Sequence, residues 1–427
     1  MRWDRWYTVK SYIRSALWTI PLIALILEQI TVRLVSTVDV DLPWVPEVAT
    51  TVSGATGVMD TVTTLAVSFM VFTFGSMLVA IQVAGGQMTP RIIATALLRD
   101  NPIRFTVGLF MITMLFSTGM SARTGTEIPH LALLIVTFLG VASVAAFLFL
   151  IDYTARLLRP VTIVWLIAEQ GLEVIEAVYP DVIKAPHRPI SAHELPERES
   201  RVIVHQGSSA VVLAVNLRML VREAQRADGI VELVHRVGDF VSVGEPLFRL
   251  YGNAATIDDR KLRAQVAFGR ERTIEQDALF AFRVIVDIAV KALSKAINDP
   301  TTAVLAIDQI HRLLRSVGRR HLHDDSVFDA NGNLRLIFPT PDWEDFVQLS
   351  FAEIRLYGAE NFQVARRLRA MILNLIAGLP EARWPALQRE MELLDRSLEL
   401  SYRIPEDLEF AKQPDLQGLG GTSSRRS

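Results

Sequence analysis

The chain has 427 residues, of which 50% are hydrophobic, and its formal net charge is -2. This near-neutral charge excludes a global electrostatic attraction for nucleic acid, and the absence of cysteine excludes disulfides, thiolate metal sites and cysteine nucleophiles. Apolar residues are concentrated in the first third of the sequence, which indicates a membrane segment followed by a soluble segment. The length suggests two or three domains.

The first expected element is a cytoplasmic interfacial segment over residues 1–14, where basic residues are mixed with Trp and Tyr. A first membrane span is predicted over residues 15–35. Glu28 lies inside it, and an intramembrane carboxylate marks a functional site by default. The alternative is that Glu28 sits near the outer interface or pairs with Arg33 or a neighbouring helix. The sequence leaves both interpretations open.

The second predicted span dominates the sequence, because no charged residue occurs from Thr61 to Pro90. About 20 apolar residues cross a bilayer core as a helix, so we predict a span over residues 61–84 and an exit near Arg91. Small and polar residues recur along the span at helical spacing and share one face. The candidate residues on this face are Ser68, Gly75, Gln82 and Gly86. The face either packs against other helices or lines a wet path, and the Gln82 amide needs partners that lipid does not offer.

Two more spans are predicted over residues 105–122 and 131–151, which completes a transmembrane domain over residues 15–155. Lys and Arg gather before the first span, between the second and third, and after the fourth. The positive-inside rule therefore predicts four spans in a bacterial inner membrane, with both termini cytoplasmic. A helix over residues 160–178 begins at a proline and is expected to be an interfacial or elbow helix, or a plain packing helix.

After a linker, residues 201–251 are predicted to form a small β module. Its β-branched runs indicate strands, and Asn216 is suited to cap a helix from Leu217 to Ala227. The Gly-Asp and Gly-Glu turns near residues 238–245 resemble half of a barrel-sandwich of the biotinyl or lipoyl type. Such carriers present a modified lysine, and no lysine occurs from Arg201 to Arg260, so only a structural adaptor or assembly role remains.

A helical cytoplasmic domain is predicted over residues 260–403, and it begins with a dense charged cluster. The members of this cluster are Arg270, Glu271, Arg272, Glu275 and Asp277. On a helix, Glu271 and Glu275 would lie one turn apart. The carboxylates could act as general acid and base, but charge balance by the neighbouring arginines explains them as well.

Further along, Asn298, Asp299 and Pro300 are predicted to end one helix and begin the next, with Asp299 as its N-cap. A β-hairpin is expected near residues 327–338. The segment from His321 to Asp325 could chelate a metal, but we expect a solvated loop.

Arg366, Arg367 and Arg369 form a basic stripe that is expected to be solvated or to pair with another subunit. The composition of residues 413–427 predicts a disordered tail.

Several of these stretches together resemble one bacterial membrane family, the domain of unknown function 2254 (DUF2254). The resemblance rests on the charged cluster, the Asn298–Pro300 turn, the Pro90-Arg91 exit and the four-span layout, and it covers about Arg14 to Leu400. The chain departs from the family pattern at Lys295-Ala296, where Pro-Gly is usual. The resemblance implies this topology, no established activity and no catalytic residues.

The fold class expected is an α-helical membrane domain of four transmembrane helices plus an α+β cytoplasmic domain, with a barrel-sandwich-like β module and a helical C-terminal part. No nucleotide-binding, zinc-protease or serine-hydrolase motif is present, so we predict no enzyme, cofactor or metal. The leading hypothesis is an oligomeric channel or transport protein for a small ion or solute, assembled or gated by its cytoplasmic part. The alternative is a membrane-anchored sensor or scaffold that binds a ligand or protein. The expected partners are the lipid bilayer and further copies of the chain, and not nucleic acid.

Overall fold

The computed structural model describes residues 3–7, 19–35, 51–87, 101–123, 130–157, 159–183, 198–322 and 325–420. The chain divides into two compact units. Residues 12–86 and 90–163 form the N-terminal unit. Residues 164–427, with residues 1–11 and 87–89, form the C-terminal unit.

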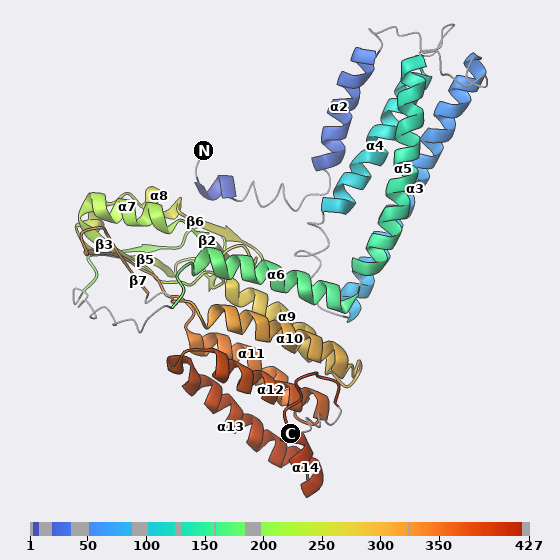
Figure 1. Cartoon of the computed structure of the whole chain (residues 1–427). Helices are drawn as coiled ribbons and strands as arrows, with labels where there is room; N and C mark the ends of the chain where they lie inside the picture. The colour runs from blue at the N-terminus through green and yellow to red at the C-terminus, as the bar shows by residue number, and fades with distance from the viewer. Residues whose placement is uncertain are drawn as a thin grey trace. The chain divides into compact units, whose positions relative to one another are not determined.

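The N-terminal unit is helical. Its helices are α2 (Thr19–Val35), α3 (Val52–Gln87), α4 (Asn101–Ser121) and α5 (His130–Leu157) (Figure 1). Three of them contain stretches long and apolar enough to cross a membrane, namely Val52–Val79, Asn101–Ser121 and His130–Arg156. The first predicted span corresponds to α2, which has only 17 residues. The four-span layout therefore stays a prediction, whereas three apolar helices are observed.

The second span differs from its prediction at its N-terminal end. The helix starts at Val52, not at Thr61, so that Asp60 belongs to the candidate span. The neighbouring helix supplies a donor for this carboxylate, since Ser121 Oγ donates to Asp60 Oδ1 at 3.0 Å. The start of the charge-free run therefore did not mark the start of the helix.

Close packing joins α3, α4 and α5. Ala55, Met59 and Val62 of α3 pack in one cluster with Phe116 of α4 and Leu133 of α5. A Cβ placed on Gly140 of α5 would lie 2.9 Å from a methyl carbon of Val62, so only glycine permits this approach. Buried hydroxyls add polar links, because Thr113 and Ser143 lie 3.1 Å apart and Ser117 donates to the Met59 carbonyl at 2.7 Å.

Two small sheets open the C-terminal unit. The strands are β1 (Arg201–Val204), β2 (Ala210–Val215), β3 (Gly229–Leu233), β4 (Phe240–Val241), β5 (Pro246–Gly252), β6 (Val266–Gly269), β7 (Ser326–Phe328) and β8 (Leu334–Ile337). One sheet has the order β1-β5-β3-β8-β7 and is antiparallel except between β3 and β8, and the other has the order β4-β2-β6. The predicted hairpin supplies β7 and β8, so the sheets extend beyond the predicted module of residues 201–251.

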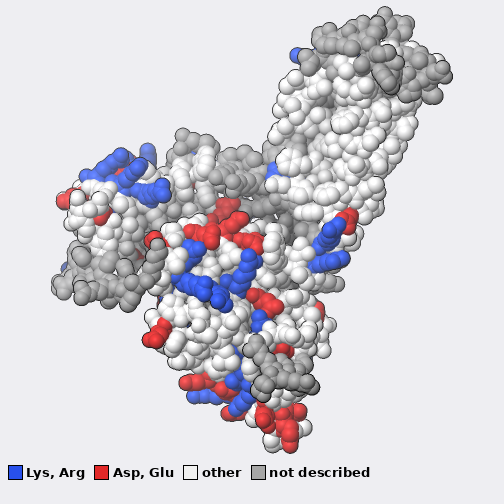
Figure 2. Space-filling model, in the orientation of Figure 1, with Lys and Arg blue, Asp and Glu red and all other residues white. Residues whose placement is uncertain are grey.

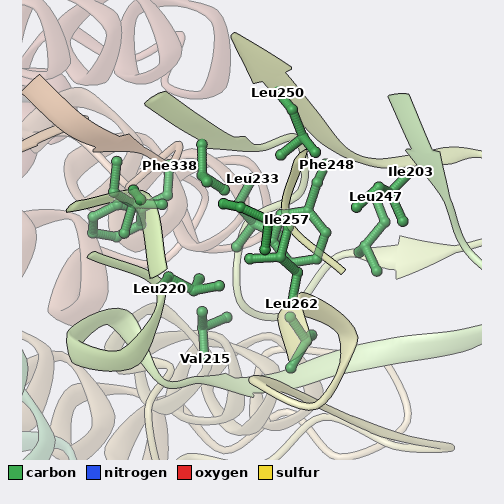
Figure 3. Close-up of a cluster of buried hydrophobic side chains, with 14 of the residues drawn as sticks. Ile203, Val215, Leu220, Leu233, Leu247, Phe248, Leu250, Ile257, Leu262 and Phe338 are labelled. Carbon is green, nitrogen blue, oxygen red and sulfur yellow. The ribbon is translucent and has the colours of Figure 1, made fainter. Parts of the chain in front are cut away.

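The core of this α/β part lies between strands and two helices, α7 (Leu217–Ala227) and the short α8 (Asp259–Arg263). Figure 3 shows Leu220 of α7 and Leu262 of α8 directed toward Phe248 and Leu233 of the sheet. Every second residue is buried along β3 and along β2 up to Ala214, as expected for strands, whose side chains alternate between two faces. Asn216 caps α7, with its side chain accepting from the Met219 amide at 3.3 Å, and α7 has the predicted bounds.

The remaining helices are stacked in layers. They are α6 (Pro160–Val178), α9 (Ala278–Ala292), α10 (Pro300–Val317), α11 (Trp343–Gly358), α12 (Phe362–Gly378), α13 (Trp384–Ser401) and α14 (Pro405–Ala411) (Figure 1). Within the C-terminal unit, α6 packs on α9 and α10: a Cβ on Gly171 would lie 2.9 Å from Ala281, and Arg312 pairs with Glu169 at 2.7 Å. Asp299 caps α10, accepting from the Thr302 amide at 3.0 Å.

Two predictions about the C-terminal part are wrong. The Arg366 side chain is fully buried. Arg367 pairs with Asp308 at 2.6 Å, and Arg369 pairs with Asp395. The three arginines are therefore buried or paired within the chain and do not form a solvated stripe. The part of the predicted disordered tail that the structure describes, up to residue 420, is also held against α12 through Arg366. Residues 421–427 lie outside the described part.

Candidate functional site

The first candidate site is a polar stripe along α3, which we define as Thr61, Thr64, Ser68, Gly75 and Gln82. All five residues are exposed on the single chain. At 100° per residue, the stripe lies on the side of α3 opposite the buried residues Met59, Ala66, Thr73 and Met77. The helices of its own chain therefore cover the other side of α3 and leave the stripe uncovered.

The stripe combines satisfied hydroxyls with one exposed amide. Thr61, Thr64 and Ser68 donate to carbonyl oxygens four residues earlier at 2.7, 2.8 and 2.8 Å. The Gln82 side chain makes no hydrogen bond within the part of the chain that the structure describes. No atom lies within 4 Å of a Cβ placed on Gly75, so the space beside it is open.

Two predicted membrane residues add nothing to this geometry. Gly86 lies near the end of α3 and Glu28 lies in α2, but the surroundings of both fall outside the described residues. Asp60 was not singled out from the sequence, because it ended the charge-free run. It lies at the edge of the stripe, one residue before Thr61.

The second candidate site is a cavity of about 480 Å³ in the C-terminal unit. It lies where β2, β3 and β8 end and where α7 and α9 begin. Its apolar wall includes Leu233, Val237 and Phe338, and its polar groups include Tyr179, His235, Glu275, Gln276, Asp277 and Thr340. Mostly apolar lining with a few converging polar groups is typical of a small-molecule site.

Asp277 anchors the start of α9 at this cavity. Its Oδ1 accepts from the Phe280 amide at 3.0 Å, and its Oδ2 lies 3.0 Å from a guanidinium nitrogen of Arg272. Burial raises the pKa of the Asp277 carboxyl, while the charge of Arg272 opposes that rise. Gly238, at φ +95°, packs directly on this pair, and any side chain there would displace it. Asp277 therefore has a structural role, as the N-cap of α9 and the ion-pair partner of Arg272, and its carboxyl is not available as a general acid.

The charged cluster predicted from the sequence is only partly assembled. Residues 270–277 precede α9 as a turn, so Glu271 and Glu275 do not lie on one helix face, which corrects the prediction. Arg270 and Glu271 are exposed, whereas Glu275 and Asp277 line the cavity. Helix α9 begins only after Asp277, whose side chain caps it, so the charge spacing before Asp277 did not indicate a helix. Among the described residues, no group of His, Asp and Glu is arranged to hold a metal ion.

Sequence reasoning missed His235 and Tyr179. The His235 Nε2 atom is buried without a hydrogen-bond partner in the described part of the chain. Tyr179 is 2% exposed, and burial raises the pKa of its phenol. Neither belongs to a local motif, because the cavity is made by segments far apart in sequence.

Comparison with known families decides the class of the chain. A family model described as a predicted membrane protein, DUF2254, matches residues 14–374. The chain belongs to this family. Uncharacterised proteins of Mycobacterium tuberculosis (Rv1290c) and Mycobacterium bovis (Mb1321c) are 27% identical to it over 386 residues, covering 87% of this chain and 72% of each relative. No solved structure matches the chain. Membership of DUF2254, together with three apolar helices, identifies the chain as a predicted membrane protein, and the resemblance seen in the sequence is confirmed.

Proposed function

We propose that this DUF2254 protein is an oligomeric channel or transport protein for a small ion or solute. The observation that carries the proposal is the exposure of the whole polar stripe of α3 on a single chain. An amide without a hydrogen-bond partner, such as that of Gln82, is costly against hydrocarbon, and such a group faces a protein partner or a water-filled path instead. Copies arranged around an axis would bring their stripes together.

Cation transport is favoured over anion transport. Asp60 places a carboxylate at the edge of the stripe, about 12 Å along α3 from Val52. No Lys or Arg occurs on α3. A ring of Asp60 carboxylates in an oligomer would attract cations and repel anions, as acidic rings do at channel mouths.

Cysteine cross-linking tests the oligomer, because the chain contains no natural cysteine. We expect Ser68→Cys to form disulfide-linked dimers in membranes under mild oxidation. The matched control is Val67→Cys, since Val67 is also exposed on α3 but points about 100° away. Equal cross-linking of both variants, or of neither, would contradict the assignment of the stripe as the contact face.

Flux through reconstituted liposomes tests transport. We expect Gln82→Leu and Ser68→Leu to reduce cation flux on the order of ten-fold, the effect of about 1.4 kcal/mol on a barrier. Asp60→Asn should lower the preference for cations over anions. Leu65→Ala, an exposed apolar position of the same helix, is the control and should leave flux unchanged. Absence of flux in the unaltered protein, or flux that is insensitive to the stripe variants, would overturn the proposal.

A second candidate function is ligand sensing, and the cavity with its unpartnered His235 Nε2 favours it. We expect a small molecule that occupies the cavity to raise the midpoint of thermal unfolding of the whole protein in detergent. His235→Phe removes a buried nitrogen without a partner, so its unliganded stability should stay within about 1 kcal/mol of the original. The same variant should lose the ligand-induced rise. If ligands that raise the midpoint do so equally in both proteins, the cavity is not their site.

A further inference from the structure

One side of helix α7 is buried in the core, and the opposite side is exposed. Leu220 and Ala224 are fully buried, and Val221 packs partly against the same cluster. On the opposite side, Arg218 and Arg222 are exposed, as the 100° turn per residue requires. The helix is therefore amphipathic, and its free side is basic.

The basic side of α7 continues onto α8. Arg218, Arg222 and Arg226 follow one another at four-residue steps, so they form a row along α7. Helix α8 adds Arg260 and Lys261, both of which are exposed. Figure 2 shows Lys and Arg side chains gathered over α7 and α8. We name this surface the basic patch, and it consists of Arg218, Arg222, Arg226, Arg260, Lys261 and Arg263.

Few carboxylates neutralise the basic patch. Glu223 pairs with Arg226 at 2.7 Å and lies 3.9 Å from Lys261, which ties the two helices together. Asp259 lies 3.7 Å from Arg263 and also pairs with Arg201. The Asp258 carboxylate caps α8 by accepting from the Arg260 amide.

Among the described residues, three cations of the patch have no ion pair. Arg218, Arg222 and Arg260 have no carboxylate partner within the described residues. The net charge of the whole chain is -2, so the patch is a local concentration of cations and not a share of a global excess.

We propose that the basic patch binds the phosphate headgroups of anionic phospholipids in the membrane that holds the protein's own apolar helices. Arginine guanidinium groups match phosphate oxygens in pairs. Anionic leaflets attract basic segments by an amount that corresponds to about a five-fold change in bound population for each basic residue. Tethering by the apolar helices keeps this surface at a high effective concentration of headgroups. A partner free in solution has no such tether, so it would meet the patch only at its own concentration.

The proposal is tested by energy transfer in nanodiscs. The whole protein carries Gln225→Cys, an exposed position on α7 and its only cysteine, labelled with a donor dye. Headgroups carry the acceptor. We expect higher transfer in discs enriched in phosphatidylglycerol than in phosphatidylcholine discs, and we expect high salt to remove the difference. A second label at Glu392→Cys, exposed on α13, should show no dependence on lipid charge.

Two triple variants with the same change in net charge separate the patch from general electrostatics. Replacing Arg218, Arg222 and Arg226 by glutamine should abolish the lipid-dependent rise in transfer. Replacing the exposed Arg389, Arg396 and Arg403 by glutamine should preserve it. Thermal unfolding of each variant in detergent checks that the fold is retained. Transfer that does not depend on lipid charge, or equal loss in both triple variants, would overturn the proposal. So would binding of the patch to RNA or to an acidic protein without any response to lipid.

Discussion

Replacing Arg366 by alanine is expected to lower the free energy of unfolding by about 3–5 kcal/mol, the cost of removing one partner from a buried charged network. The side chain is 0% exposed. It donates to the carbonyls of Gln413 and Gly420 at 3.0 and 3.1 Å and lies 4.1 Å from the ring centroid of Phe410. Alanine would leave both carbonyls without a donor and a cavity against the ring. Thermal unfolding of the detergent-solubilised protein measures the loss.

Arg389 provides the control for this variant. It is exposed on α13, so Arg389→Ala should change the free energy of unfolding by no more than about 0.5 kcal/mol. Limited proteolysis adds a local readout, because Arg366→Ala should release the segment of residues 412–420 and expose it to cleavage. A variant with unchanged stability and an intact segment would show that Arg366 does not hold the tail.

Replacing Asp277 by alanine is expected to cost about 3 kcal/mol, because the change removes a helix cap and leaves a half-buried guanidinium without its partner. The carboxylate is 5% exposed, accepts from the Phe280 amide and holds Arg272 through two guanidinium nitrogens. Asp277→Asn should cost less, since asparagine caps a helix as well as aspartate does but removes the charge. Chemical or thermal unfolding compares the two variants.

Asp299 is the matched control for Asp277. It caps α10 in the same way, by accepting from the Thr302 amide, but no ion pair joins it to a basic residue in the described part of the chain. Asp299→Ala should therefore cost only about 1 kcal/mol. Equal losses for the two alanine variants would mean that the ion pair with Arg272 contributes nothing.

Local signals predicted many elements of the C-terminal unit. Asn216 and Asp299 were assigned as caps from residue type alone, and each accepts the expected amide. The Asn331-Gly332 turn joins β7 and β8, with Gly332 at φ +80°. Such signals succeed because a cap or a tight turn depends on a few neighbouring residues, and distant parts of the chain do not alter its geometry.

Contacts between residues far apart in the sequence could not be predicted from such local signals. Arg366, Arg367 and Arg369 look like a solvated stripe in sequence, yet Arg366 is buried beneath a segment about fifty residues further on. The candidate cavity is lined by Trp3 and by residues between 177 and 341, so His235 and Tyr179 belong to no local motif that could have marked them. Strand β3 pairs in parallel with β8, a partner a hundred residues away.

The sequence by itself showed that the chain belongs to DUF2254. It determined that the chain has apolar helices of membrane length, because hydropathy and length are properties of the residues along one helix. It also determined the small and polar composition of one face of α3. Only the tertiary structure decided that this face is the uncovered one, that α3 begins early enough to include Asp60, and that the cations of α7 and α8 form one patch. These outcomes depend on which surfaces pack together, and packing is a property of the folded chain as a whole and not of any single segment.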